Sequence, residues 1–400
     1  MKSCFPNPND NKSITPLHKS NHFTLSTAAF TTTISSLPDD LLLECLSRVP
    51  SSSLPSLSLV CRRWSLLLLS PSFFNLRRHR NRLHSTLFAV FLSASIPTST
   101  LSIATLSLPD QQHLGTSWQR DSDLKTDSIF LGNSNLLHGF FSQARLAAIG
   151  PKIYIIGKNV TLVYDTWTKT ITPRSPMSFP RKKFGCAVVF GKIYVAGGSS
   201  RAESTVDEYD PGTDTWRVVV HAPRRRYGCL GASVDGVFYV IGGLKICCAA
   251  TAGTEAHVYA SSMDLYDVKS RAWLRSRTVP GGGCVVAACA AVGHVYVLTS
   301  HAVELSLWRF AARRNTAAFG EWSRIKRPPF PPQVRLDNTV KFSCVGAGDK
   351  VVLVQVGSAR NTRGLREGLV LIYDTVGECW SRGPDLPDVI RRAAVVNVEW

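Results

Sequence analysis

Hydrophobic positions from about residue 86 to the C-terminus repeat one pattern of short apolar runs separated by polar turns. The clearest copy is KIYVAGGSSRAESTVDEYDPGTDTW at 192–216. It consists of an apolar strand, a Gly-Gly pair, a polar loop, a second strand ending in Tyr-Asp, a turn and a Trp. Short β-rich runs bounded by glycine and turn residues predict strands rather than helices. Recurrence of the whole pattern predicts an array of similar small sheets.

A Tyr-Asp pair recurs in most copies of the pattern. In three copies a Trp lies seven residues after the Tyr: Tyr209/Trp216, Tyr266/Trp273 and Tyr373/Trp380. A fourth copy has Tyr164 but Ile171 in place of the Trp, and a fifth lacks the glycines and has Trp322 as its late Trp. Each of the five copies begins with a further strand of small residues, at 143–150, 184–191, 227–236, 283–293 and 342–348.

The two ends of the array are incomplete in complementary ways. Residues 86–93, 101–108 and Trp118 form a unit that lacks its own first strand, whereas the strand at 393–399 has nothing after it. Pairing of these two ends would close a ring and remove exposed strand edges. The pattern therefore predicts six four-stranded units, with five or seven as alternatives.

The Gly-Gly, Tyr-Asp and Trp positions together resemble the kelch repeat. This resemblance implies a mainly β fold, a six-bladed kelch β-propeller over 86–400. The resemblance is clear over about 141–390 and weaker over 86–140. Small residues in the first strands suit the crowded axis of a propeller, and the glycines would allow φ > 0 or close backbone approach. We expect the repeated Tyr and Trp side chains to fill gaps between blades and to be structural.

A single segment before the repeats has helical periodicity. It begins with helix-start signals, because Ser36 or Asp39 can cap a helix, Pro38 suits an initial position and acidic residues favour the positive end. Apolar residues then fall at helical spacing, and Pro50 ends the run. A second run puts further residues on one face, namely Leu57, Val60, Cys61, Trp64 and Leu68. A third piece starts at Ser70 and becomes strongly basic.

Three short helices make only a marginal core. Their leucine-rich faces need a cover, which is either a partner surface or the repeat domain itself. The residues LPDDLLLECLSRVP and SLVCRRWSLLLLSPSFF, from 36 to about 76, closely resemble the F-box. The family pattern is a Leu-Pro start, a leucine-rich first helix ending near Pro, a Val-(Ser/Cys)-(Lys/Arg)-x-Trp core and a later Phe.

The F-box joins substrate receptors to the Skp adaptor of Skp–cullin–F-box ubiquitin ligases. Carried over to this chain, the resemblance implies an apolar surface that faces the adaptor or supports it. Its members are Leu37, Pro38, Leu41, Leu46, Val49, Leu57, Val60, Cys61 and Trp64. Some of these belong to the internal core, and the sequence does not separate the two sets.

These patterns divide the chain into a disordered leader at 1–34, an F-box helical domain at 35–83 and a kelch β-propeller at 86–400. The leader has no continuous apolar core of the kind that a secretory signal needs, although a transit peptide is an alternative. The longest apolar run, 284–298, is too short to span a membrane and is broken by Gly293 and His294. We therefore expect no contact with a membrane.

Composition and charge narrow the class of protein. Hydrophobic residues make up 44% and charged residues 18% of the chain, as in a globular protein, and the formal net charge is +18. Such a charge is compatible with nucleic acid, an anionic membrane or an acidic protein partner. None of the eleven cysteines forms a CxxC pair, and most lie in apolar runs. This usage predicts a reduced, intracellular protein, cytoplasmic or nuclear or both.

The charged loops predict a surface for a target protein. Four antiparallel strands per unit bring the loop before the first strand and the loop between the second and third strands to the same side. Variable loops on a rigid scaffold are the usual place for recognition. We expect a basic rim that binds an acidic or phosphorylated segment through charge-assisted hydrogen bonds. Its predicted members are Arg181, Lys182, Arg224, Arg225, Arg360, Arg363 and Arg391. Alternatively, an arginine before the first strand is structural.

No catalytic chemistry is apparent. The sequence has no phosphate loop, no GxSxG, no HExxH and no Cys/His metal spacing, so we expect no catalytic residue, no metal and no cofactor. A secreted copper oxidase, known among kelch propellers, would need a secretory signal and a His/Tyr/Cys copper site. A basic run, Arg77, Arg78, Arg80 and Arg82, lacks interleaved aromatics, which favours a solvated helix face over nucleic-acid binding.

The predicted function combines both resemblances. The chain would be the non-catalytic substrate-recognition subunit of a Skp–cullin–F-box ubiquitin ligase. Its F-box would dock on a Skp-type adaptor, and through it on a cullin, while its propeller binds a target protein for ubiquitination and degradation. Such a subunit raises effective concentration and breaks no bonds. The alternative is a scaffold or sequestering protein that binds partners through the propeller without assembling a ligase.

Overall fold

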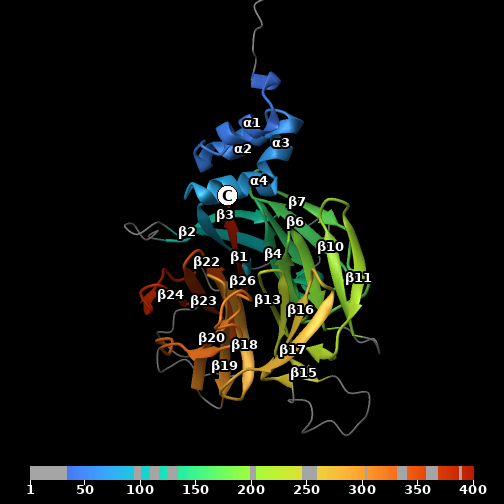
Figure 1. Cartoon of the computed structure of the whole chain (residues 1–400), viewed down its shortest axis with the longest axis vertical. Helices are drawn as coiled ribbons and strands as arrows, with labels where there is room; N and C mark the ends of the chain where they lie inside the picture. The colour runs from blue at the N-terminus through green and yellow to red at the C-terminus, as the bar shows by residue number, and fades with distance from the viewer. Residues whose placement is uncertain are drawn as a thin grey trace, which may run out of the picture. The chain divides into compact units, whose positions relative to one another are not determined.

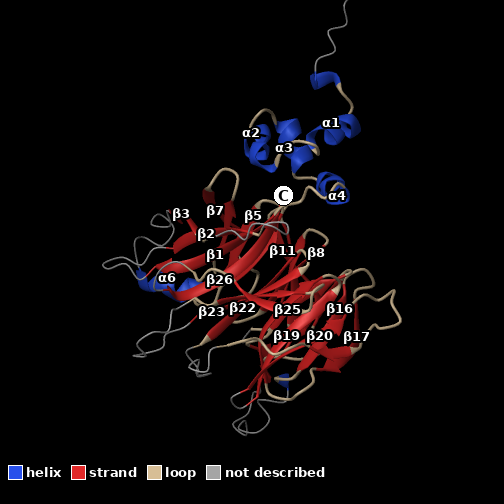
Figure 2. Ribbon diagram, turned by 90° about the vertical axis from the view of Figure 1, so that its left-hand side faces the viewer, coloured by secondary structure: helices blue, strands red, loops and turns tan. Residues whose placement is uncertain are grey.

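The computed structural model describes residues 34–93, 101–108, 117–124, 134–198, 204–245, 259–301, 304–330, 340–356, 368–386 and 390–400 (Figures 1 and 2). The predicted leader spans 1–34, and all of it except residue 34 lies outside the described residues. Residue contacts divide the chain into two compact units, 1–42 and 43–400, so that the boundary lies inside the first helix. The domain boundaries expected from the sequence stay a prediction.

The helical segment contains four short α-helices and two 3₁₀ turns among its described residues. They are η1 (Ile34–Ser36), α1 (Asp39–Leu46), η2 (Ser51–Ser53), α2 (Leu54–Ser58), α3 (Arg62–Leu68) and α4 (Pro71–His79). The last helix begins where the sequence predicts, because Ser70 Oγ accepts a hydrogen bond from the Phe73 amide at 3.2 Å and Pro71 follows the cap. No helix in the described parts of the chain is long and apolar enough to cross a membrane.

The second predicted helical run is split into α2 and α3, which corrects the expectation of one continuous apolar face. Cys61 interrupts it with an extended backbone (φ −159°, ψ 164°). Its Sγ accepts a hydrogen bond from the Trp64 amide at 3.5 Å and thereby caps α3. Val60 and Cys61 consequently lie in the connecting turn, where both are exposed.

The basic run on α4 is only partly a solvated helix face. Arg77 is fully buried, contrary to that expectation, because its guanidinium is enclosed by hydrogen-bond acceptors. These are the carbonyl oxygens of Ser47, Val49 and Arg82 and the Ser51 hydroxyl, at 2.7–3.3 Å. The other three arginines of the run also have partners. Arg78 contacts Asn75 on the same helix, whereas Arg80 contacts Glu44 and Arg82 contacts the Arg48 carbonyl. The basic run therefore links α4, and the residues just after it, to α1 and to the segment that follows α1.

The described strands form six four-stranded antiparallel sheets, the blades of a β-propeller, and one two-stranded sheet of β12 (Arg226–Tyr227) and β15 (Leu244–Lys245). In order from the first to the fourth strand, blade 1 consists of β26 (Ile390–Glu399), β1 (Ser85–Ser93), β2 (Leu101–Ser107) and β3 (Gln119–Leu124); blade 2 of β4 (Arg145–Ile149), β5 (Lys152–Ile156), β6 (Thr161–Asp165) and β7 (Thr170–Arg174); blade 3 of β8 (Gly185–Val189), β9 (Lys192–Ala196), β10 (Thr205–Asp210) and β11 (Thr215–His221); blade 4 of β13 (Leu230–Val234), β14 (Val237–Ile241), β16 (Ser262–Asp267) and β17 (Ala272–Thr278); blade 5 of β18 (Cys284–Ala291), β19 (His294–His301), β20 (Glu304–Ala311) and β21 (Trp322–Arg324); and blade 6 of β22 (Lys341–Ala347), β23 (Lys350–Val356), β24 (Val370–Asp374) and β25 (Cys379–Arg382).

The predicted six-unit count and the predicted ring closure are both confirmed. The C-terminal strand β26 pairs with β1 over nearly its whole length, with Val396 opposite Phe88. It thus supplies the first strand that the 86–118 unit lacks. The closure covers the strand edge that β1 would otherwise expose.

The first strands of the blades surround a central channel of about 450 Å³. Small residues are required there, as the sequence predicts. A Cβ on Gly231 would lie 2.4 Å from the carbonyl oxygen of Cys186 in the neighbouring blade, and a Cβ on Gly346 would lie 2.0 Å from that of Ala290. Any side chain at either position would push two first strands apart.

The repeated aromatic pairs join neighbouring blades. Within a blade the Tyr and Trp rings lie close together, with centroids 5.0 Å apart for Tyr209 and Trp216. The indole Nε1 of Trp216 then donates a hydrogen bond to the Ser175 carbonyl at 2.9 Å, in the segment that leaves the preceding blade. The equivalent indole bonds are Trp118 to Pro384, Trp273 to His221 and Trp380 to Lys326. Each indole therefore ties its blade to the one before.

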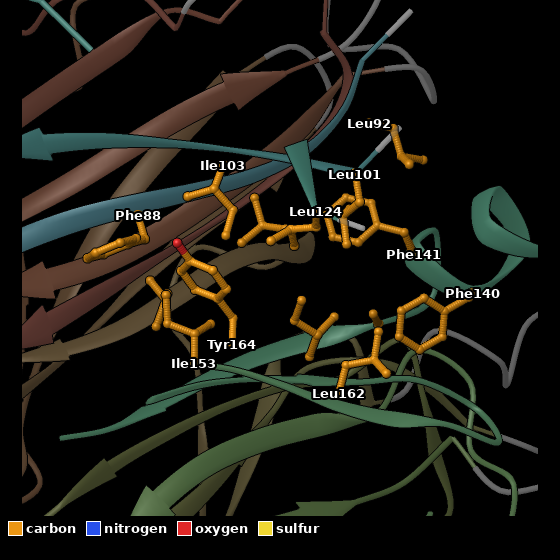
Figure 3. Packing of buried hydrophobic residues seen from close by; sticks show 14 of the residues in the cluster. Phe88, Leu92, Leu101, Ile103, Leu124, Phe140, Phe141, Ile153, Leu162 and Tyr164 are labelled. Carbon is orange, nitrogen blue, oxygen red and sulfur yellow. The ribbon is translucent and has the colours of Figure 1, made fainter. Parts of the chain in front are cut away.

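A helix that the sequence interpretation missed covers one seam of the ring. Helix α6 (Ser134–Phe141) lies beside blades 1 and 2 (Figure 2). Its Phe140 and Phe141 belong to a buried cluster with Leu101, Leu124 and Leu162 from the two blades (Figure 3). The helix thereby fills the space at the outer part of this seam with apolar side chains.

Helix α4 contacts the propeller at the ends of the first strands. The Phe74 ring lies 3.2 Å from the position a Cβ would take on Gly150, which follows β4. Arg78 and Glu399, at the end of β26, approach to 3.7 Å between Nη2 and Oε2. The backbone of His84 exchanges two hydrogen bonds with that of Trp400 (Figure 1). We call this side of the propeller, where first strands turn into second strands, the turn face, and the opposite side the loop face.

Candidate functional site

The helical module exposes apolar side chains although it has a filled core. Leu54, Leu68 and Phe73 are fully buried, which leaves little apolar volume unused inside. On the outside, Leu59 is 73% and Leu66 62% exposed. These apolar side chains are therefore available for contact with another molecule.

The predicted adaptor-facing set divides into three groups in the structure. Pro38, Leu41, Val60 and Cys61 are exposed; Leu37, Val49, Leu57 and Trp64 are half-buried; Leu46 is buried. Leu46 therefore supports the module from within. Sequence reasoning missed Leu59 and Leu66, because they lie off the face that a continuous helix would have presented. Their position beside Val60 and in α3 becomes apparent only when the helix break at Cys61 is known.

On the loop face, Arg181 is enclosed within blade 3 and has no exposed surface. Its Nη2 donates to Asp207 Oδ1 at 2.8 Å and to Thr205 Oγ1 at 2.6 Å, and its Nη1 donates to the Gly197 carbonyl at 2.9 Å. Asp207 is itself fully buried. The guanidinium thus joins the segment before the first strand to the second and third strands of the same blade. The prediction that Arg181 contacts a target does not agree with this burial, and the structural alternative holds for it.

Blade 4 contains the same arrangement around Arg226. Its Nε donates to Asp264 Oδ2 at 2.9 Å and its Nη1 to the Gly242 carbonyl at 2.7 Å. Both arginines lie four residues before the first strand, so the structural equivalent of Arg181 is Arg226. The similar tripeptides Phe-Gly-Cys at 184–186 and Tyr-Gly-Cys at 227–229 are not structurally equivalent. Relative to the first strand of its blade, the second tripeptide lies two positions earlier than the first.

The remaining basic residues of these two loops differ in accessibility. Lys182 and Lys183 are exposed, and the ammonium of Lys183 lies 5.5 Å from the ring centroid of Tyr227. Arg224 is half-buried, ion-pairs with Asp264 and stacks near Tyr259, with 5.5 Å between its Cζ and the ring centroid. Arg225 is half-buried as well. The aromatic neighbours were not anticipated from the sequence.

Three predicted members of the basic rim are not placed by the structure. Arg360 and Arg363 lie outside the described residues. Arg391 belongs to β26, but its side chain lies outside the description. Their assignment to a target-binding face stays a prediction.

Several His and Asp side chains in the described parts of the chain serve packing and turns. No three of His, Cys, Asp and Glu come together there in a way that would hold a metal. His294 is held by its ring Nδ1 at 2.9 Å from the Val292 carbonyl, and burial lowers its pKa. The Asp residues of the Tyr-Asp pairs accept backbone hydrogen bonds in the following turn, as Asp374 does from Val376 and Gly377 at 2.8 and 3.0 Å. These contacts and the two Arg–Asp pairs are structural.

Comparison with known proteins agrees with this geometry. The family model of the F-box domain matches residues 34–76, and that of the Kelch motif matches 180–221. The F-box/kelch-repeat protein At5g26960 of Arabidopsis thaliana is 55% identical over 100% of this chain and 97% of its own length. The chain belongs to the F-box/kelch-repeat protein family. F-box/kelch-repeat protein At1g67480 of the same plant is 27% identical, over 52% of this chain and 54% of its own.

Membership in the F-box/kelch-repeat family identifies the chain as a protein of the substrate-adaptor type. F-box domains generally bind Skp-type adaptors, and kelch propellers bind targets. A more distant solved structure, "Structure of YjhT", aligns with a TM-score of 0.48 and 16% identity over 62% of this chain and 85% of that one. That likeness is too low to add to the functional argument.

Proposed function

We propose that this F-box/kelch-repeat protein is the target-binding subunit of a Skp–cullin–F-box ubiquitin ligase. The observation that carries the proposal is the exposed apolar surface of Leu59, Val60 and Leu66 on a helical module whose core is already filled. Burial of such side chains at an interface stabilises a complex by about 25 cal/mol for each Å² removed from water. A bound partner would bury these side chains, which the helical module leaves exposed to water.

The arrangement of the propeller supports the second half of the proposal. Helix α4 contacts the turn face, whereas Lys182 and Lys183 precede the first strand of blade 3 and so lie on the loop face. An adaptor bound to the helices and a target bound to the loop face then occupy opposite ends of the blades. The subunit holds the target at high effective concentration near the ubiquitin-transferring machinery.

The chemistry of the loop face favours an acidic or phosphorylated target segment. Lys182 and Lys183 present exposed ammonium groups. In the equivalent loop of the next blade, before its first strand, Arg224 and Arg225 add two half-buried guanidinium groups. Hydrogen bonds from such cations to carboxylate or phosphate are roughly twice as strong as neutral ones. The tyrosine rings beside Lys183 and Arg224 provide apolar contact for the rest of the segment.

Co-purification from cells tests the ligase assignment. The wild-type chain should recover a Skp-type adaptor together with a cullin, and the double variant Leu59→Asp/Val60→Asp should lose both. Val376→Asp is a matched control, because Val376 is an exposed apolar residue in a turn of blade 6. Recovery of adaptor without cullin, or adaptor binding with no protein stabilised when residues 36–76 are deleted, would instead support the scaffold or sequestering function.

A charge-reversal experiment tests the target face. Proximity labelling with the wild type and with Lys182→Glu/Lys183→Glu should reveal labelled proteins that depend on these lysines. Lys269→Glu serves as the control, since Lys269 is an exposed lysine in a turn between the third and fourth strands of blade 4, on the turn face. An unchanged set of labelled proteins in the double variant would exclude these lysines from target binding.

A further inference from the structure

Two cysteine thiols from neighbouring blades lie almost within bonding distance on the wall of the central channel. Cys289 is in β18 of blade 5 and Cys344 is in β22 of blade 6. Their Sγ atoms are 3.1 Å apart, and both side chains are free thiols. A disulfide bond is about 2.0 Å long, so the two sulfur atoms need to move together by only about 1 Å.

The seam between these two strands has no backbone ladder. The sheets of blades 5 and 6 are separate, and each ends at its own first strand. The two first strands are nevertheless packed closely, since a Cβ on Gly346 would meet the Ala290 carbonyl at 2.0 Å. A covalent bond at this point would therefore add a link between two first strands that meet only through side-chain packing, without requiring the strands to approach further.

The channel is large enough for hydrogen peroxide. Both cysteines line the cavity of about 450 Å³, whereas one water molecule in the liquid takes up about 30 Å³. Hydrogen peroxide is little larger than water and can enter such a space.

We propose that Cys289 and Cys344 form a reversible disulfide that fastens blade 5 to blade 6 when hydrogen peroxide reaches the channel. Cys344 is the more exposed of the two and reacts first. Its sulfur attacks one peroxide oxygen, the O–O bond breaks, and the thiol proton leaves with the departing hydroxide as water. The Cys289 sulfur then attacks the sulfur of the Cys344 sulfenic acid, the S–O bond breaks, and the second proton and hydroxide leave as water. Two thiols and one peroxide give one disulfide and two waters.

Cys289 is suited to the second step rather than the first. The hydrogen bond with Cys344 and burial hold its pKa well above the usual range for a thiol. Because the thiolate is the form that attacks peroxide, the Cys289 thiol is a poor first nucleophile, whereas its 3.1 Å contact with the Cys344 sulfur places it for the second step. Cys186, on β8 of the same channel, provides a comparison.

Peptide mapping of the full-length protein tests the proposal. The reduced chain is treated with a few equivalents of hydrogen peroxide, alkylated under denaturing conditions and digested. We expect one cross-linked peptide pair joining Cys289 to Cys344, cleaved again by dithiothreitol, and an increase of roughly 2–5 °C in melting temperature.

The variants separate this bond from general oxidation. Cys344→Ser should abolish both the cross-link and the shift in melting temperature, and Cys186→Ser should retain both. The mapping on the wild type is decisive even if a variant folds poorly. Full alkylation of Cys289 and Cys344 after peroxide treatment, or a cross-link from either to another cysteine, would overturn the proposal.

Discussion

The buried pair of Arg181 and Asp207 gives the sharpest prediction about stability. Arg181→Ala removes a guanidinium that donates hydrogen bonds to the Asp207 carboxylate, the Thr205 hydroxyl and the Gly197 carbonyl. It leaves Asp207 with no exposed surface and without its cation. Removal of one partner from a buried ion pair typically costs about 3–5 kcal/mol, chiefly because the remaining charge is uncompensated. For a chain of this size that corresponds to a decrease of roughly 4–6 °C in melting temperature.

The assay is thermal unfolding followed by tryptophan fluorescence, because four of the indoles bridge neighbouring blades. Lys182→Ala is the matched control: the neighbouring residue is exposed, and its replacement should change stability by no more than about 0.5 kcal/mol. The double variant Arg181→Ala/Asp207→Ala should cost less than the sum of the single changes, since no charge remains buried. If Arg181→Ala unfolds no earlier than Lys182→Ala but loses target binding, the burial argument is refuted and Arg181 is a recognition residue.

Three further predictions concern other parts of the chain. Arg77→Ala should destabilise the helical module, because three carbonyl groups and a hydroxyl lose their donor; limited proteolysis should then cut within 43–83 sooner than in Arg78→Ala, and equal rates would contradict this. Gly231→Ala should lower the melting temperature more than Gly212→Ala, because its Cβ would meet the Cys186 backbone at 2.4 Å; similar effects would mean that the first strands yield. The hydrogen bond from Arg314 lowers the pKa of Asp267, so the Asp267 carboxylate stabilises the fold above the ordinary Asp pKa of about 4 and loses this contribution as the pH falls below that value. The difference in melting temperature between wild type and Asp267→Asn should therefore be larger at pH 7 than at pH 3. A pH-independent difference would exclude the ionic contribution.

Features of the fold that depend on repetition could be predicted from the sequence. The Tyr-Asp and Trp positions recur because several blades share the same turn and four share the same indole bond to the preceding blade, so the pattern, together with the small-residue first strands, shows both the blade count and the missing first strand. The glycines at Gly231 and Gly346 likewise follow from crowding that every first strand shares. Helix α6 occurs once, in a stretch whose apolar residues suit a strand equally well, and only its packing against two blades explains it.

Site residues depend on partners that are distant in sequence, and there the prediction was weaker. Arg181 and Lys182 are adjacent and both basic, but only the first is opposite a carboxylate 26 residues away. Similarly, the exposure of Leu59 and Leu66 follows from the helix break at Cys61, which depends on a cap formed by the Cys61 thiol. Charge and periodicity identified the correct loops and helices, whereas burial decided which side chains in them are available.

Binding of purified full-length protein to a purified Skp-type adaptor tests the proposed function most directly. Isothermal titration calorimetry should show one adaptor bound per chain by the wild type and by the Val376→Asp control. Leu59→Asp/Val60→Asp should show no binding while keeping the melting temperature of the propeller. Equal affinity of the double variant and the wild type, or no binding by the wild type, would contradict the proposal that this exposed apolar surface joins the chain to a ubiquitin ligase.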